Sequence, residues 1–235
     1  EQLAAACREV VAANGLVNGA YLRPVVFRGY GELSVAPQTG SPTEVAIAGW
    51  EWGNYLGHAN GAEGVDVCVS SWNRVAPNTL PSLAKAAGNY LSGQLISHEA
   101  KRLGFAEGIG LAPDGTVSEG AGENLFVVRD GVLLTPGLAH SVLGGITRDT
   151  VMRLARERGI EVRETSIPRE LLYVCDELFF TGTAAEVTPV RSVDRLQVGN
   201  GRRGPVTEAL QNAFFGLFDG RTADQWGWLD HIERT

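Results

Sequence analysis

Apolar residues recur along four stretches of the chain at the three- and four-residue spacing that is typical of amphipathic helices. In the second stretch this spacing directs Leu91, Leu95 and Ala100 toward the core, with charged residues between them. The pattern therefore predicts helices over residues 1–13, 88–103, 147–158 and 204–218.

Shorter stretches are rich in β-branched and apolar residues and are bounded by Gly, Pro and Asp, as strands usually are. Two three-residue segments between them, PDG at 113–115 and RDG at 129–131, are typical of hairpin turns. The mixture of hairpins and helices predicts an α/β or α+β fold with a largely antiparallel sheet. The expected strands are residues 20–28, 44–49, 66–70, 107–112, 116–119, 123–129, 131–135, 161–166 and 177–181.

Two loops rich in Gly and Pro divide the early part of the chain, one over residues 29–42 and one over residues 57–64. The helices and strands change in spacing after the second loop. We therefore expect a small N-terminal domain over residues 1–58, an interdomain loop over 59–65 and a larger domain over 66–235.

Composition narrows the class of protein. The chain has 235 residues, of which 44% are hydrophobic and 20% are charged, with a net charge of −7. This balance is that of a globular protein, and it argues against nucleic acid or an anionic membrane as the main partner. A local basic pocket for a phosphate or a carboxylate remains open.

Cysteine and histidine usage gives no sign of disulfides or of a metal. Cys7, Cys68 and Cys175 are odd in number and far apart, which favours a reduced, cytoplasmic setting. The four histidines lack the spacing of metal ligands, so no metal site is expected. No apolar run approaches the roughly 18–20 residues that a membrane helix needs.

Lysine is rare in this chain, and one of its lysines stands in an unusual setting. Of the 20 Lys and Arg residues only two are lysines, Lys85 and Lys101. Arg cannot serve as a nucleophilic amine, because its guanidinium stays protonated. Lys101 lies among charged residues, whereas Lys85 has no Asp or Glu within ten residues on either side. Lys85 is therefore a candidate reactive amine, desolvated by small and apolar neighbours; the alternative is an ordinary lysine at a helix end.

Three further segments supply what a phosphorylated cofactor needs. Glu119 ends a short strand before a glycine-rich turn, where a carboxylate could pair with a pyridinium nitrogen. Residues 144–147 form a glycine-rich turn that opens a helix near Thr147, and residues 181–185 follow a strand with further N–H and hydroxyl donors. Each feature alone also fits an ordinary turn. Together with Lys85 they favour pyridoxal phosphate.

Four motifs carry a resemblance to a known family. KAAGNYL (85–91), EGAGENLF (119–126), GGITRD (144–149) and FTGTAAEVTPVRSVD (180–194) resemble the class IV aminotransferases, which have the fold type IV architecture of pyridoxal-phosphate enzymes. Within that family, the chain is most similar to the branched-chain amino acid aminotransferases of bacteria. The likeness extends over essentially the whole chain. It implies a partial small domain followed by a complete larger domain, because the family has a further N-terminal segment.

The resemblance implies roles for individual residues. Lys85 matches the lysine that holds pyridoxal 5'-phosphate in a Schiff base, Tyr90 the tyrosine beside the ring oxygen, and Glu119 the partner of the pyridine nitrogen. Other positions match residues that bind the cofactor and its phosphate: Asn124, Leu143, Gly145, Ile146, Thr147, Gly182 and Thr183. Positions that match substrate-facing residues are Tyr21, Arg23, Tyr55, Thr183 and Ala184.

The implied reaction is transamination between Leu, Ile or Val and 2-oxoglutarate, which gives branched-chain 2-oxo acids and L-glutamate. Arg23 is the expected partner for the distal carboxylate of glutamate. The resemblance also implies a homodimer or a higher homo-oligomer. Three alternatives stay open: a D-amino acid aminotransferase, an aminodeoxychorismate lyase of the same fold, and an inactive fragment without the N-terminal segment.

Overall fold

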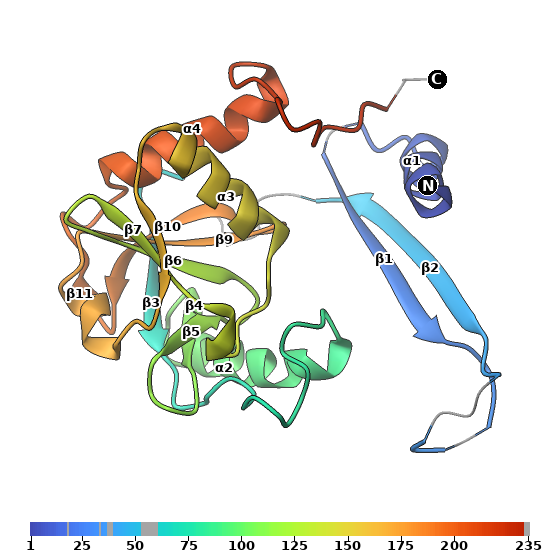
Figure 1. Cartoon of the computed structure of the whole chain (residues 1–235), viewed down its shortest axis with the longest axis horizontal. Helices are drawn as coiled ribbons and strands as arrows, with labels where there is room; N and C mark the ends of the chain where they lie inside the picture. Colours follow the sequence, from blue (N-terminus) through green and yellow to red (C-terminus); the bar gives the residue numbers. More distant parts are fainter. Residues whose placement is uncertain (18, 33, 37–39, 53–60, 233–235) are drawn as a thin grey trace. The chain divides into compact units, whose positions relative to one another are not determined.

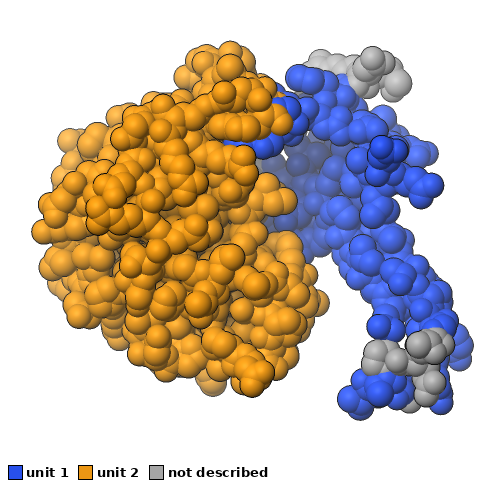
Figure 2. Space-filling model, in the orientation of Figure 1, with its two compact units in different colours: residues 1–55, 227–235 blue, residues 56–226 orange. Residues whose placement is uncertain are grey.

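The computed structural model describes residues 1–17, 19–32, 34–36, 40–52 and 61–232. The chain divides into two compact units, residues 1–55 with 227–235 and residues 56–226, which Figure 2 distinguishes by colour. The first unit contains helix α1 (Gln2–Ala13) and two strands, β1 (Ala20–Arg28) and β2 (Thr43–Glu51). The strands pair antiparallel from Ala20 opposite Glu51 to Arg28 opposite Thr43.

The C-terminal residues group differently from the expected domain over residues 66–235. Residues 227–235 belong to the first unit rather than to the second. One physical reason is an ion pair between the Arg8 guanidinium of α1 and the Asp230 carboxylate, which lie 2.6 Å apart. The expected boundary loop over residues 59–65 lies partly outside the described residues.

A nine-stranded mixed sheet forms the centre of the second unit, within the part of the chain that the structure describes (Figure 1). The strand order is β5–β4–β3–β10–β9–β6–β7–β8, and β11 pairs with β10. Three pairs are parallel (β3 with β4, β3 with β10, β7 with β8) and the others are antiparallel. The strand bounds are β3 (Val65–Val69), β4 (Glu107–Leu111), β5 (Val117–Gly120), β6 (Asn124–Arg129), β7 (Val132–Pro136), β8 (Val162–Thr165), β9 (Glu177–Gly182), β10 (Glu186–Val193) and β11 (Leu196–Gln197).

The sheet is curved so strongly that its two ends approach each other. The main-chain N–H of Val117 in β5 donates to the carbonyl oxygen of Ile167, just after β8, at 2.8 Å. The hydrophobic core lies inside this curve and includes Val67, Ile109 and Phe180, all fully buried. The curvature brings β5, which carries Glu119, close to strands that are far from it in the strand order.

Three α-helices cover the sheet: α2 (Tyr90–Arg102), α3 (Ile146–Glu157) and α4 (Pro205–Asp219). Helix α2 contacts β4, α3 contacts β9, and α4 contacts β9 and β10. Pro205 opens α4 at a position where its missing N–H costs nothing, and Gly220 ends that helix with φ at +79°. The described residues of this unit also form three short 3₁₀ helices: η1 (Ala87–Asn89), η2 (Leu138–His140) and η3 (Arg169–Tyr173). No helix within the described residues is long and apolar enough to cross a bilayer.

Two expectations about elements are wrong. Strand β10 is present in the structure but is not among the strands expected from the sequence. Pro189 lies in its middle, and a proline argues against a central strand. The structure accommodates Pro189 opposite Phe179 of β9, next to an irregularity in the pairing with β3. In α2, Leu91 and Leu95 are exposed, whereas Gly93, Ile96 and Ala100 are buried.

The buried face of α2 follows from how closely this helix approaches the turn after β5. A Cβ on Gly93 would lie 2.2 Å from the main-chain oxygen of Ala121, a contact that no real Cβ makes. Only a glycine lets the helix backbone reach this turn. The larger Leu91 and Leu95 therefore occupy the other face.

Replacing Gly93 with Ala tests this close approach. Alanine normally stabilises a helix interior relative to glycine by about 1 kcal/mol. Here we expect Gly93→Ala to lower the free energy of unfolding by roughly 1–3 kcal/mol, because the helix or the turn must move. Denaturant unfolding of the purified protein measures the change.

The matched control is Gly88→Ala in η1, where an added Cβ would meet nothing within 4 Å. This variant should lie within about 0.5 kcal/mol of the parent protein. Equal effects at Gly88 and Gly93 would contradict the close packing of α2 on the turn.

Candidate active site

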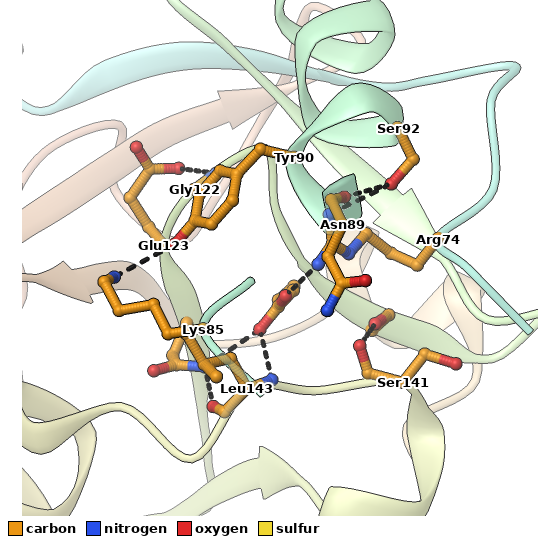
Figure 3. Close-up of polar contacts among 12 residues, drawn as sticks. Arg74, Lys85, Asn89, Tyr90, Ser92, Gly122, Glu123, Ser141 and Leu143 are labelled. Carbon is orange, nitrogen blue, oxygen red and sulfur yellow. Dashed lines mark hydrogen bonds and ion pairs between the residues drawn. The ribbon is translucent and has the colours of Figure 1, made fainter. Parts of the chain in front are cut away.

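Lys85 lies in the segment that leads into η1, and its amine points at a tyrosine. The Lys85 Nζ donates a hydrogen bond to the Tyr90 Oη at 3.0 Å (Figure 3). The segment is held in place by Asn89, a buried residue whose side-chain amide donates to the carbonyl oxygens of Pro81 and Ala84, each at 2.9 Å. The Lys85 side chain is exposed in this chain, so the desolvated setting expected from the sequence is not present within the chain itself.

Glu119 is buried in β5 and is surrounded by hydrogen-bond donors. Its Oε1 accepts from the Arg74 guanidinium at 2.6 Å, and its Oε2 accepts from the side-chain amide of Asn124 and from the main-chain N–H of Leu143, both at 3.0 Å. Burial raises the pKa of the Glu119 carboxyl, while the Arg74 charge and the N–H of Leu143 act against this rise. The carboxylate is thus fixed in position by three elements of the second unit.

Asn124, the first residue of β6, links Glu119 to the two predicted anion sites. Its amide also donates to the carbonyl oxygen of Leu143 at 2.8 Å. A Cβ on Gly145 would lie 2.1 Å from the Asn124 Oδ1, so the turn before α3 touches this side chain. Asn124 pairs with Thr181 in the neighbouring strand β9. The glycine-rich turn at 144–147 and the turn at 181–185 therefore both lie next to Asn124.

The first of these turns begins α3, as the sequence predicts, with Gly145 as the N-cap residue. Ile146 is 86% exposed and Thr147 is 8% exposed, so Ile146 faces solvent at this turn and Thr147 is packed inside. The second turn follows β9, where Gly182 ends the strand and Thr183 is exposed. The Thr181 hydroxyl is buried and has no hydrogen-bond partner among the described residues.

A small, partly open cavity of about 30 Å³ lies beside Glu119 and Tyr90. Other residues of the predicted site line it, notably Asn124 and Leu143. The remaining lining residues are Arg74, Ser82, Ala84, Asn89, Ala121, Gly122 and Glu123.

Glu123 is a second buried carboxyl in the cavity wall, and its surroundings differ from those of Glu119. Its Oε2 accepts from the main-chain N–H of Gly122 at 3.0 Å (Figure 3). Burial, together with the nearby Glu107 carboxyl, raises the Glu123 pKa to about 8. Burial also raises the pKa of Glu107, which is 1% exposed. Near pH 7, Glu123 is therefore mostly neutral.

These residues fit the group that the motifs imply. Pyridoxal phosphate needs an amine, an acid for its ring nitrogen, and donors for its phosphate. Of these three kinds of group, the buried carboxylate of Glu119 lines the cavity. The exposed amine of Lys85 contacts the lining residue Tyr90, and the N-terminus of α3 lies against the lining residue Asn124. The orphaned hydroxyl of Thr181 adds an unused donor next to Asn124.

The expected substrate residues of the N-terminal region lie in the first unit. The Arg23 guanidinium donates to the Tyr21 Oη at 3.2 Å, and Tyr21 packs against Trp50 and Trp52 with ring centroids 5.2 and 5.1 Å apart. Tyr55 lies outside the described residues. Thr183 and Ala184 belong to the second unit, in the turn between β9 and β10.

Sequence reasoning missed three residues of this site: Arg74, Asn89 and Glu123. Arg74 is one of many arginines and belongs to no motif. Asn89 and Glu123 lie inside the motifs KAAGNYL and EGAGENLF, so the motifs themselves were the available signal.

Comparisons with known proteins agree with this geometry. The family model described as "Amino-transferase class IV" matches residues 1–193. The chain is 56% identical over 234 residues to the branched-chain-amino-acid aminotransferase of Escherichia coli (strain K12). The matched region covers 100% of this chain and 75% of that protein.

Two solved structures are also similar. That of the Escherichia coli branched-chain amino acid aminotransferase has a TM-score of 0.95 at 57% identity, covering 99% of this chain and 76% of that chain. That of the branched-chain amino acid aminotransferase from Thermobaculum terrenum, in its PLP-form, has a TM-score of 0.91 at 34% identity, covering 99% of this chain and 75% of that chain.

The raised pKa of Glu123 predicts a pH-dependent stability. Because the folded value of about 8 exceeds the ordinary value of 4.5, this group supports the fold fully at low pH. That support is lost as the pH rises from 4.5 through 8. Glu123→Gln mimics the neutral carboxyl, so at pH 9 it should be more stable than the parent protein, by on the order of 1–3 kcal/mol.

Urea unfolding at pH 5, 7 and 9 checks this expectation, with Glu157→Gln at the exposed end of α3 as the control. The advantage of Glu123→Gln should grow with pH, and Glu157→Gln should show no such trend. A constant difference at all three values would mean that Glu123 ionises normally in the folded protein.

Proposed function

This chain belongs to the class IV aminotransferases, and we propose that Lys85 is the residue through which it binds its cofactor, pyridoxal 5'-phosphate. The protein transfers the amino group between branched-chain L-amino acids and 2-oxoglutarate, which yields branched-chain 2-oxo acids and L-glutamate. The observation that carries the role of Lys85 is its hydrogen bond to Tyr90 at the cavity whose wall contains Glu119.

When bound, pyridoxal phosphate supplies a protonated ring that accepts electrons from the α-carbon of the amino acid. Glu119 would pair with the ring nitrogen and keep it protonated, since its carboxylate is held in place by Arg74, Asn124 and Leu143. The Tyr90 hydroxyl orients the ring through the ring oxygen and also hydrogen-bonds the Lys85 Nζ. The free Lys85 amine would act as a general base that takes the proton from the α-carbon of the amino acid, and the resulting ammonium would act as a general acid that delivers this proton to the cofactor.

The two turns next to Asn124 would hold the phosphate. The main-chain N–H groups of Ile146 and Thr147 lie at the positive end of α3, where an anion is stabilised by the helix dipole. Gly145 permits the contact with Asn124, because any side chain there would overlap it. Gly182 and Thr183 add donors from the turn after β9.

Substrate recognition divides between two kinds of group. The main chain of Thr183 and Ala184 receives the α-carboxylate, as the matching positions of the family do. By the family resemblance, Tyr21 and Tyr55 match positions that face the substrate, and Arg23 is the proposed partner for the distal carboxylate of glutamate. An apolar pocket separates such side chains by only about 1–3 kcal/mol per methylene, so more than one branched amino acid is accepted.

We also propose that the protein works as a homodimer or a higher homo-oligomer in the cytoplasm. The support for the assembly is the family resemblance, since family members complete the substrate pocket partly across a subunit interface. The support for the compartment is the three free cysteines. Burial raises the pKa of Cys68 and of Cys175 to about 11, so these thiols are poorly reactive.

The scarcity of lysine allows a clean test of Lys85. After incubation with pyridoxal phosphate and borohydride reduction, the intact mass of the parent protein should increase by one cofactor. Lys85→Ala should lose this increase and lower transamination of L-Leu by roughly 10²–10⁴-fold or more, because both the anchor and the base are gone. Lys101→Ala, which removes the other lysine, should keep both the mass increase and the transamination of L-Leu.

Attachment that survives in Lys85→Ala would contradict the assignment. The parent protein is assayed in parallel with L-Leu, D-Ala and aminodeoxychorismate. A preference for either of the last two substrates would place the activity elsewhere in the family, and failure of the parent to take up cofactor would identify the chain as inactive.

A substitution of Arg23 tests the recognition of the second substrate. Arg23→Gln should lower kcat/KM for 2-oxoglutarate by roughly 10–100-fold, because a charged hydrogen bond to the distal carboxylate is lost. The kcat/KM for a branched-chain 2-oxo acid should change little. Arg28→Gln is the control, since Arg28 lies in the same strand and is exposed. An equal loss for both substrates would show that Arg23 does not select the distal carboxylate.

A further inference from the structure

Three buried carboxyl groups lie close together at the wall of the active-site cavity, and one guanidinium contacts one of them. Glu107 in β4, Glu119 in β5 and Glu123 just before β6 are each at most 5% exposed. Arg74 is 8% exposed, and its ion pair with Glu119 is almost fully buried. Three buried carboxylates cannot all be ionised beside one positive charge.

Arg74 is built into this position by the main chain and by two neighbouring elements. Its main-chain N–H donates to the carbonyl oxygen of Leu111 at the end of β4, at 2.8 Å. Its guanidinium donates to the Ser92 hydroxyl of α2 at 3.2 Å (Figure 3). It also donates to Glu119 at 2.6 Å. Gly110, which pairs with Glu119 in the sheet, leaves room for the Arg74 stem, since a Cβ there would lie 2.9 Å from the Arg74 Cγ.

We propose that Arg74 is a positioning residue that decides which buried carboxyl carries the negative charge: it keeps Glu119 ionised for the cofactor, while Glu123 stays protonated. This inference rests on the proposed function, since it concerns the carboxylate assigned to the ring nitrogen. Arg74 also lines the cavity, and it acts through its ion pair with Glu119.

The hydrogen bonds around the two carboxyls support this choice. Every described partner of the Glu119 carboxyl is a donor: Arg74, the Asn124 amide and the Leu143 main chain. A protonated Glu119 would have no acceptor for its hydrogen among these groups, so they favour the ionised form. Glu123 accepts from the main chain of Gly122 and faces no such positive partner among the described residues that contact it.

Other charged groups act on the same cluster and must be considered in any pH experiment. The Lys85 amine favours ionised Glu119, and Lys101 favours ionised Glu107. Glu107 and Glu119 both oppose the ionisation of Glu123. Arg74 lowers the pKa of both Glu119 and Glu123, but it contacts only Glu119. Removing the Arg74 charge therefore removes the largest effect that opposes burial at Glu119, and leaves the Leu143 N–H and the Lys85 amine to oppose it.

The first measurement is the affinity of Arg74→Gln for pyridoxal phosphate. If the pKa of Glu119 rises to about one unit above the assay pH, only about a tenth of the protein has the ionised carboxylate, and the dissociation constant rises roughly tenfold. The ratio of the variant to the parent constant should be largest near pH 6–7 and fall toward pH 9. A purely structural role would give a ratio that does not depend on pH.

The second measurement needs no cofactor. In the cofactor-free protein, Arg74 stabilises the fold most where Glu119 is ionised, so Arg74→Gln should lose stability relative to the parent as the pH rises from 5 to 9. Urea unfolding over this range measures the gap. The pH trends of affinity and stability thus run in opposite directions, which a general packing defect would not produce.

Arg74→Lys keeps a positive charge and should restore most of the affinity at pH 7. Arg203→Gln, which removes a half-buried arginine beside Gln211 near the start of α4, is the matched control and should shift neither pH profile. A Lys variant as weak as the Gln variant, or flat profiles in Arg74→Gln, would overturn the inference.

These outcomes remain separate from those that test the proposed function. If the parent protein binds no cofactor, the proposed function fails, but the unfolding experiment still decides whether Arg74 controls Glu119. If the parent binds cofactor through Lys85 and the profiles of Arg74→Gln are flat, the function stands and the role of Arg74 fails.

Discussion

Burying the charge of Glu119 is the constraint around which the second unit is arranged. An ionised carboxylate inside a protein must be surrounded by donors, or its desolvation destabilises the fold. Here the donors come from three different places: Arg74 after β3, Asn124 at the start of β6 and Leu143 before α3. One buried charge therefore ties together segments that are far apart along the chain. The same segments form the wall of the cavity.

Small residues make this arrangement possible, because several backbones must approach one another around the carboxylate. Gly93 allows α2 to contact the turn after β5, and Gly145 allows the turn before α3 to contact Asn124. Both contacts are too close for a Cβ. The start of α3, which offers N–H groups to an anion, is thereby placed next to the residue that also holds Glu119. The position of Glu119 and the position of the N–H groups at the start of α3 thus depend on the same residue, Asn124.

Much of the fold could be predicted from the pattern of apolar residues. The predicted bounds of β1 agree to the residue, and those of the four α-helices agree within one to two residues. Strand β10 escaped prediction because Pro189 interrupts its pattern, although tertiary pairing with β3 and β9 holds it in the sheet. The face of α2 was misassigned because hydrophobicity favoured Leu91 and Leu95, whereas the backbone approach at Gly93 decided the orientation. A property of two elements together cannot be read from the periodicity of one.

The candidate site shows the same limit for single residues. Lys85 could be recognised because lysine is scarce here and its neighbours carry no charge, and Glu119 because a glycine-rich turn follows it. Arg74 gave no such signal, since arginine is common along this chain and the residues around Arg74 form no motif. What distinguishes Arg74 is its burial against Glu119, and that depends on Gly110 in another strand and Ser92 in a helix. Residues that touch a cofactor leave a local trace in the sequence, because chemistry restricts their type; a residue that acts through another is restricted by geometry alone, and only the folded structure reveals it.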